Sequence, residues 1–189
     1  MRLKTALLAM SLAGALGAPA AVAQNSRTGR TGDTTGQTSM TKPADKASKA
    51  FIKKAIEGDI AEVSVGKLAQ EKGQSQAAKD FGAMLVKDHG EHKAKAEEVA
   101  SEIGVKPPTA ASIGEKATYA KLKALSGASF DKAFAKAMVK DHEGDIKEFK
   151  KESSRNDPAG KLAQETLPTL QKHLQTAQQL AGQLKQSSR

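Results

Sequence analysis

The chain has 189 residues, of which 38% are hydrophobic and 3% aromatic, and it contains no cysteine or tryptophan. The lack of cysteine excludes disulfides, thiolate chemistry and covalently attached c-type haem. The formal net charge of +9 is spread through lysines that alternate with acids. This pattern is typical of a solvated helix surface; it argues against nucleic-acid binding and favours at most weak contact with an anionic envelope surface.

The N-terminal residues have the features of a secretory signal peptide over residues 1–23. Two basic residues, Arg2 and Lys4, precede an apolar stretch that ends before the small residues Ala21-Val22-Ala23. The next segment, residues 24–44, is rich in Thr, Gly and Ser, which predicts a disordered linker. We therefore expect an exported protein, periplasmic or secreted, that is cleaved after its Ala-Val-Ala segment.

Apolar residues recur at helical spacing through the rest of the chain, residues 45–186, and Ala, Lys, Gln and Leu dominate its composition. Capping residues such as Ser75 and breakers such as Gly73 set the helix boundaries. Four long helices are predicted over residues 45–73, 75–104, 129–154 and 157–186. A short helix over residues 112–126 is predicted in the connection between the second and the third. Four long helices that are each apolar on one side predict an all-α fold, a four-helix bundle with one short extra helix.

One sequence segment occurs twice, as FGAMLVKDH ending at His89 and as FAKAMVKDH ending at His142. Each histidine follows an apolar residue, Leu85 or Met138, by four positions. Both imidazoles are therefore expected on or beside the buried face of their helix. Burying such a group is unfavourable without partners, so other polar side chains are expected at the same depth.

The position of each polar side chain along its helix identifies those partners. Four of them lie eleven to sixteen residues from the nearest predicted end of their helices: Glu62, His89, His142 and His173. At about 1.5 Å per residue, these offsets are roughly 16 to 24 Å. The four side chains are therefore predicted to meet in one layer in the middle of the bundle.

This layer has two interpretations that the sequence leaves open. As a metal site, it would bind a transition metal (Fe, Zn, Cu or Ni), with Asp88 and Asp141 as further ligands or as acceptors for imidazole N–H groups. As a structural network, the same groups would hydrogen-bond to one another and fix the register of the helices. His92 is expected at the boundary of the layer, and Asp59 lies one turn before Glu62 on a neighbouring edge.

Three segments also carry a resemblance: GDIAEVSVGKLA around Glu62, the two boxes ending in KDH, and LPTLQKHL around His173. They resemble a bacterial exported family of unknown function that is labelled as an outer-membrane protein and grouped with ferritin-like four-helix bundles. The resemblance covers residues 46–184. It implies a ferritin-like bundle able to hold metal in its core, and it implies no established activity.

From these patterns we expect an exported metal-binding or metal-handling bundle. The alternative is a structural or stress-related cell-envelope protein whose His/Glu layer is only a hydrogen-bonded network. A metal-dependent oxidase ranks third, because ferritin di-iron sites use several glutamates and this layer is dominated by histidine. No nucleophile–base set or phosphate-binding loop is visible in the sequence.

Overall fold

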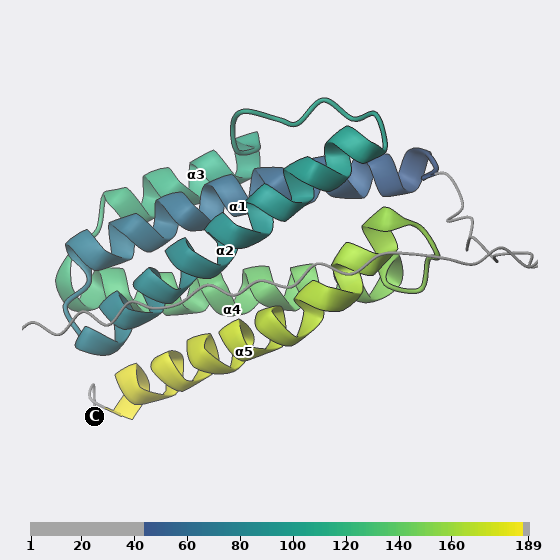
Figure 1. The fold of residues 1–189 in the computed structure, drawn as a ribbon. Coiled ribbons are helices and arrows are strands. Elements are labelled where there is room, and N and C mark those ends of the chain that lie inside the picture. Colours follow the sequence, from purple (N-terminus) through teal and green to yellow (C-terminus); the bar gives the residue numbers. More distant parts are fainter. Residues whose placement is uncertain (1–43, 187–189) are drawn as a thin grey trace, which may run out of the picture. The chain divides into compact units, whose positions relative to one another are not determined.

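Five α-helices and no strand make up the part of the chain that the computed structural model describes, residues 44–186. The helices, drawn in Figure 1, are α1 (Lys46–Lys72), α2 (Gln76–Glu102), α3 (Ile113–Lys123), α4 (Gly127–Glu152) and α5 (Pro158–Gln186). They confirm the all-α prediction, and α3 is the short helix expected in the connection. The predicted signal peptide and nearly all of the predicted linker lie outside the described residues.

The helices begin where capping side chains take up their first free N–H groups. Asp45 accepts hydrogen bonds from the first turn of α1 at 2.9 and 3.0 Å. Ser112 and Glu115 form the capping box of α3, and Asp157 accepts a hydrogen bond from the backbone of Gly160 at 2.8 Å in α5. The sequence predicted these starts because the residues involved are the ones that satisfy unpaired helix N–H groups.

The start of α4 differs from the prediction. The sequence places it after Ser129, whereas the helix begins at Gly127 with Ser126 as its N-cap. Ser126 makes no side-chain hydrogen bond to the helix. The chain instead turns into α4 through Gly127 at φ 59°, a left-handed value that glycine adopts without strain. A rule based on capping side chains therefore misplaces this helix end.

Helix α1 packs most extensively against α2, and α4 against α5, while α3 lies alongside α1 (Figure 1). The first pair is unusually close at one point. A Cβ atom added to Gly66 would lie 2.6 Å from the carbonyl oxygen of Gly82, and one added to Gly82 would lie 2.6 Å from the oxygen of Gly66. The two glycines therefore let the backbones touch and fix the register of α1 against α2 near the middle of the molecule.

A polar layer divides the apolar core into two ends. The core at one end includes Leu68, Phe81, Leu85, Phe134, Met138 and Leu180. The core at the other end includes Ile52, Ile56, Phe149, Leu162 and Leu170. The buried polar side chains between them come from all four long helices and are Asp59, Glu62, His89, His142 and His173. None of the helices within residues 44–186 has the length and hydropathy needed to cross a membrane.

Candidate metal centre

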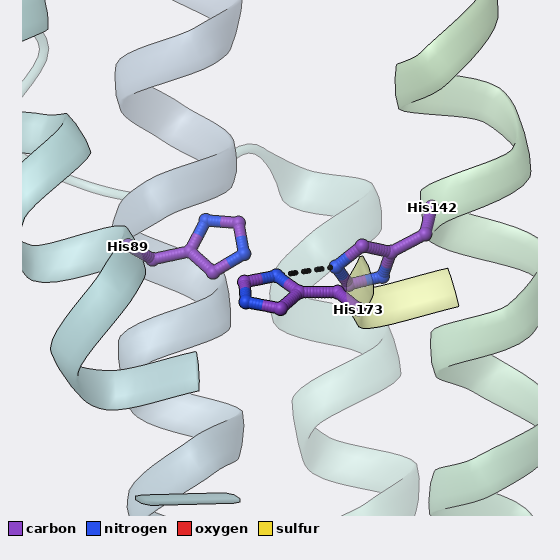
Figure 2. Close-up of side chains that lie close together, drawn as sticks. All are labelled: His89, His142 and His173. Carbon is purple, nitrogen blue, oxygen red and sulfur yellow. Dashed lines mark hydrogen bonds between the residues drawn. The ribbon is translucent and has the colours of Figure 1, made fainter. Parts of the chain in front are cut away.

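Three histidine rings meet in this layer, His89 from α2, His142 from α4 and His173 from α5. They are 6%, 0% and 0% exposed. Figure 2 shows the rings directed toward one another. One ring nitrogen from each histidine lies within 4.8 Å of the other two. The structure therefore brings together the three histidines that the sequence placed at one depth, and we call them the histidine triad.

Each ring of the triad uses its other nitrogen to hydrogen-bond an acceptor outside the triad. These outer contacts are His89 Nδ1 to Asp59 Oδ1 at 2.9 Å, His142 Nδ1 to the Met138 carbonyl oxygen at 3.0 Å, and His173 Nε2 to Asp88 Oδ2 at 3.0 Å. A carbonyl or an ionised carboxylate only accepts, so the ring nitrogen facing it must carry the hydrogen. The outer partners therefore assign the tautomer of every ring.

The inner nitrogens consequently carry no hydrogen when the rings are neutral. His142 Nε2 and His173 Nδ1 face each other at 3.3 Å, the contact drawn as a dashed line in Figure 2. His89 Nε2 is buried and has no hydrogen-bond partner within residues 44–186. Neutral rings in these tautomers place two acceptors against each other, which is unfavourable without a cation between them.

A proton does not readily supply that cation at neutral pH. Burial, together with repulsion from the other two histidines, lowers the pKa of His142 to about 3, although its hydrogen bond to the Met138 carbonyl acts in the opposite direction. Burial also lowers the pKa of His173, although its hydrogen bond to Asp88 acts in the opposite direction. The inner nitrogens of both rings are therefore available as electron-pair donors near pH 7.

Asp88 is held ready to accept the hydrogen bond of His173. Partial burial raises its pKa, but the hydrogen bonds from His173 and Lys87 outweigh burial and lower it overall. The carboxylate is therefore ionised at neutral pH. An ionised acceptor on the outer nitrogen orients the ring and makes the inner nitrogen a better ligand.

The spacing of the inner nitrogens fits a metal ion. Two nitrogens bound tetrahedrally at 2.0–2.1 Å from Zn²⁺ lie about 3.3 Å apart. The measured separation of His142 Nε2 and His173 Nδ1 is 3.3 Å. Each outer nitrogen is also held by a carboxylate or carbonyl, the usual arrangement around metal-bound histidine. The closest pair of inner nitrogens thus has the spacing of two metal ligands, the third ring offers a nitrogen within 4.8 Å of both, and every ring has the supporting contact that such ligands use.

Glu62 lies beside the triad. It is 3% exposed, and its Oε1 is 4.0 Å from His142 Nδ1, the nitrogen that faces Met138. No hydrogen-bond donor of the described residues faces either carboxylate oxygen. Burial raises the pKa of Glu62 well above its usual value, and repulsion from Asp141, together with a hydrogen bond that protonated Glu62 shares with it, raises the pKa further. Glu62 therefore lies on the outer side of His142, away from the inner nitrogens.

The other two predicted site residues occupy different places. Asp88 contacts the triad through His173 and matches the prediction of an acceptor for an imidazole N–H group. Asp141 is exposed and lines a cavity together with Glu62. The second KDH box therefore differs from the first, because Asp141 has no hydrogen bond to a triad histidine among the contacts of the described residues.

Sequence reasoning missed the role of Asp59. Its carboxylate is 2% exposed and receives Nδ1–H groups from both His89 and His92, the latter at 2.8 and 3.0 Å. The signal was present, because His92 follows His89 by three residues and shares its helix face. Asp59 likewise precedes Glu62 by three residues. Two histidines three residues apart on one helix can contact the same acid on the adjacent helix, as His89 and His92 contact Asp59.

A family model described as a domain of unknown function, DUF4142, matches residues 33–180. Among solved structures, the chain is similar to a crystal structure of a DUF305 fragment from Deinococcus radiodurans, with a TM-score of 0.67 and 15% sequence identity over 75% of this chain and 99% of that chain. At this identity the similarity shows a shared helical fold alone. None of the curated proteins matches this chain. The family match confirms the resemblance to a family of unknown function, and neither description mentions an outer membrane.

Proposed function

Because this chain belongs to the DUF4142 family, whose function is unknown, we propose its function from the site: the histidine triad binds one transition-metal ion inside an exported, ferritin-like helical bundle. The observation that carries the proposal is the 3.3 Å contact between two ring nitrogens that have no hydrogen to share. A metal ion replaces this repulsion with two coordinate bonds. The third inner nitrogen, on His89, has no other partner in the described chain and completes the donor set.

Three neutral imidazoles favour Zn, Cu, Ni or Fe(II) among the common metals. Three protein ligands leave a further coordination position for water or another small ligand. Asp59, Asp88 and the Met138 carbonyl hold the rings in the required tautomers, so little reorganisation is needed on binding. The proposed role is therefore metal binding or metal handling, with Glu62 and Asp141 next to the metal centre.

A purely structural network is the alternative function for the same residues. It would require each buried nitrogen to find a hydrogen-bond partner, because an unmet buried polar group is costly. Asp59 and Met138 do satisfy the outer nitrogens. The inner nitrogens do not meet the requirement, and this favours the metal-binding function.

Export remains part of the proposal and is supported by the basic, apolar and small-residue pattern of residues 1–23. The periplasm or the external medium is the proposed location. N-terminal sequencing of the mature protein should begin at Gln24. Recovery of Met1 on protein from a membrane fraction would contradict this location.

The deciding experiment is a thermal melt of tag-free protein, first with chelator and then with one equivalent of Zn, Cu, Ni or Fe(II). A ligand that binds only the folded state stabilises it by about 2.7 kcal/mol at a free concentration of 100 Kd. At least one metal should therefore raise the melting temperature, and elemental analysis should find one ion per chain. His92→Gln is the matched control, because it changes a half-buried histidine that contacts Asp59 and lies outside the triad. Equal melting temperatures with every metal and with chelator would reject the proposed function.

A further inference from the structure

A cavity of about 560 Å³ lies against the triad and is lined by parts of α1, α2, α3 and α4, with Leu170 of α5. It reaches His89 and Glu62 on the inside. The exposed Asp141 and the half-buried Asp145 also line it, and both come from α4. The cavity therefore connects the surface beside α4 to one ring of the triad.

The lining of this cavity favours a cation. Acidic side chains outnumber lysines six to three among the lining residues. Glu62 adds an observation that does not depend on this count, because its buried carboxylate lines the cavity and no hydrogen-bond donor of the described residues faces either oxygen. A buried carboxylate normally has such partners. An unpartnered one at the inner end of an acidic cavity is placed to bind a positively charged group.

The cavity also has the size that a hydrated ion requires. Six waters at about 30 Å³ each, the usual first shell of a hexahydrated divalent cation, occupy roughly 180 Å³. A second groove reaches the triad region at Asp88, but three lysines along its lining, Lys87, Lys95 and Lys172, balance its three acidic side chains. Positive side chains repel an approaching cation, whereas a cleft dominated by one opposite charge attracts it and accelerates its association.

From these observations we infer that the cavity is a vestibule, which binds a hydrated divalent cation against Glu62 and Asp145 and delivers it to the histidine triad. This inference rests on the proposed metal site. Glu62 is a positioning residue in it, because it holds the cation next to the triad and is not one of the final ligands. The ion exchanges its waters for the inner nitrogens of the triad. The exchange begins at His89, the triad residue that lines the cavity.

The test is the rate at which metal-free full-length protein binds Co²⁺, followed in a stopped-flow instrument by the visible absorbance of Co²⁺ bound to histidine. Glu62→Gln and Asp145→Asn should each slow association at low salt, by at most roughly the tenfold lower end of the acceleration that a whole charged cleft provides, because each variant removes one carboxyl group. Added salt should slow the wild type more than either variant. The spectrum at saturation should be unchanged in both variants, because neither residue is a final ligand.

Glu165→Gln is the matched control, since it removes the same charge from an exposed side chain on α5 that lines the second groove. It should associate at the wild-type rate. Wild-type rates in both vestibule variants, equal slowing by the control, or an altered saturated spectrum in Glu62→Gln would each overturn the vestibule while leaving the metal site standing. A wild type that develops no absorbance would instead reject the metal site, and the vestibule with it. Asp145→Asn keeps the test valid if Glu62→Gln does not fold.

Discussion

Buried polar side chains at the ends of the helices differ from those in the middle in how fully their hydrogen bonds are satisfied. Asp131 is 1% exposed, and its two oxygens accept the backbone N–H groups of Gln74 and Ser75 at 2.9 and 2.8 Å. Asp157 accepts from the Ser48 hydroxyl at 2.6 Å and from its own helix. In the middle layer, Glu62 and His89 retain atoms without partners in the described chain. At the helix ends the exception is Glu152, where one oxygen pairs with Arg155 at 3.1 Å and the other has no partner among the described residues.

The difference indicates what each group does. A buried polar group whose partners are all present stabilises one arrangement of the chain. A buried group that keeps a polar atom without a partner makes folding less favourable. Such groups cluster where a ligand binds. We therefore assign the ends of the helices to folding and the middle layer to binding, and the predictions below are designed to separate the two.

The largest effect on folding is expected at the helix ends. Asp131→Ala removes the acceptor of two backbone N–H groups in the α1–α2 turn. Leaving these donors unpaired should lower the free energy of unfolding by about 2–4 kcal/mol. Urea denaturation measures the loss. Metal affinity should stay unchanged in the folded fraction, because Asp131 is far along α4 from His142. A loss below about 1 kcal/mol would contradict a structural role for this residue.

The middle layer should respond in the opposite way to His142→Leu. Leucine has a similar volume and removes one of two acceptors that face each other, so metal-free stability should change by less than about 1 kcal/mol. The metal-dependent gain should disappear, which is a loss of about 2.7 kcal/mol at 100 Kd. Melts with chelator and with metal measure the two values. Strong destabilisation in chelator would show instead that His142 belongs to a structural network.

The close contact between α1 and α2 supports both regions, and Gly66→Ala tests it. The new methyl group would meet the Gly82 oxygen at 2.6 Å, so the helices must separate. Overpacking of this kind costs about 1–3 kcal/mol. Because Asp59 and His89 lie on these two helices and contact each other, metal affinity should fall as well. Gly90→Ala on α2 is the control, since its added Cβ meets no atom within 4 Å. Equal stability of the two variants would show that the contact is not tight.

The sequence predicts the depth of the site better than its contacts. Helical spacing and caps correctly placed His89, His142 and His173 at one level, because rise per residue depends only on local geometry. Which ring nitrogen points inward depends on acceptors supplied by other helices, such as Asp59 and Asp88. Those pairings follow from how the helices are rotated and arranged around the core, and a periodic pattern on one helix does not contain that information.

The smallest expected effect concerns pH and the cavity wall. Burial, together with repulsion from Asp141, Asp59 and Glu115, raises the pKa of Asp145 to about 7, while Lys54 acts in the opposite direction. The unfolded chain ionises this group near its ordinary pKa of about 3.9. Between about pH 4 and 7 the folded state therefore holds more protons than the unfolded state, so this group makes stability fall as pH rises through that window.

Asp145→Asn should remove this contribution. The variant should gain stability over the wild type as pH rises from 4.5 to 8, and the gain should level off above about pH 7. We expect it to stay below about 1 kcal/mol, because Asp145 is half-buried and water screens its charge. Urea midpoints of both proteins at the two pH values measure the difference, with Glu165→Gln as the exposed control. A difference that is the same at both pH values would mean that Asp145 ionises normally. The carboxylate would then belong with the well-solvated acids of the surface, and the unmet polar atoms of the described residues would lie on Glu62, His89 and His92, apart from one oxygen of Glu152 at the end of α4.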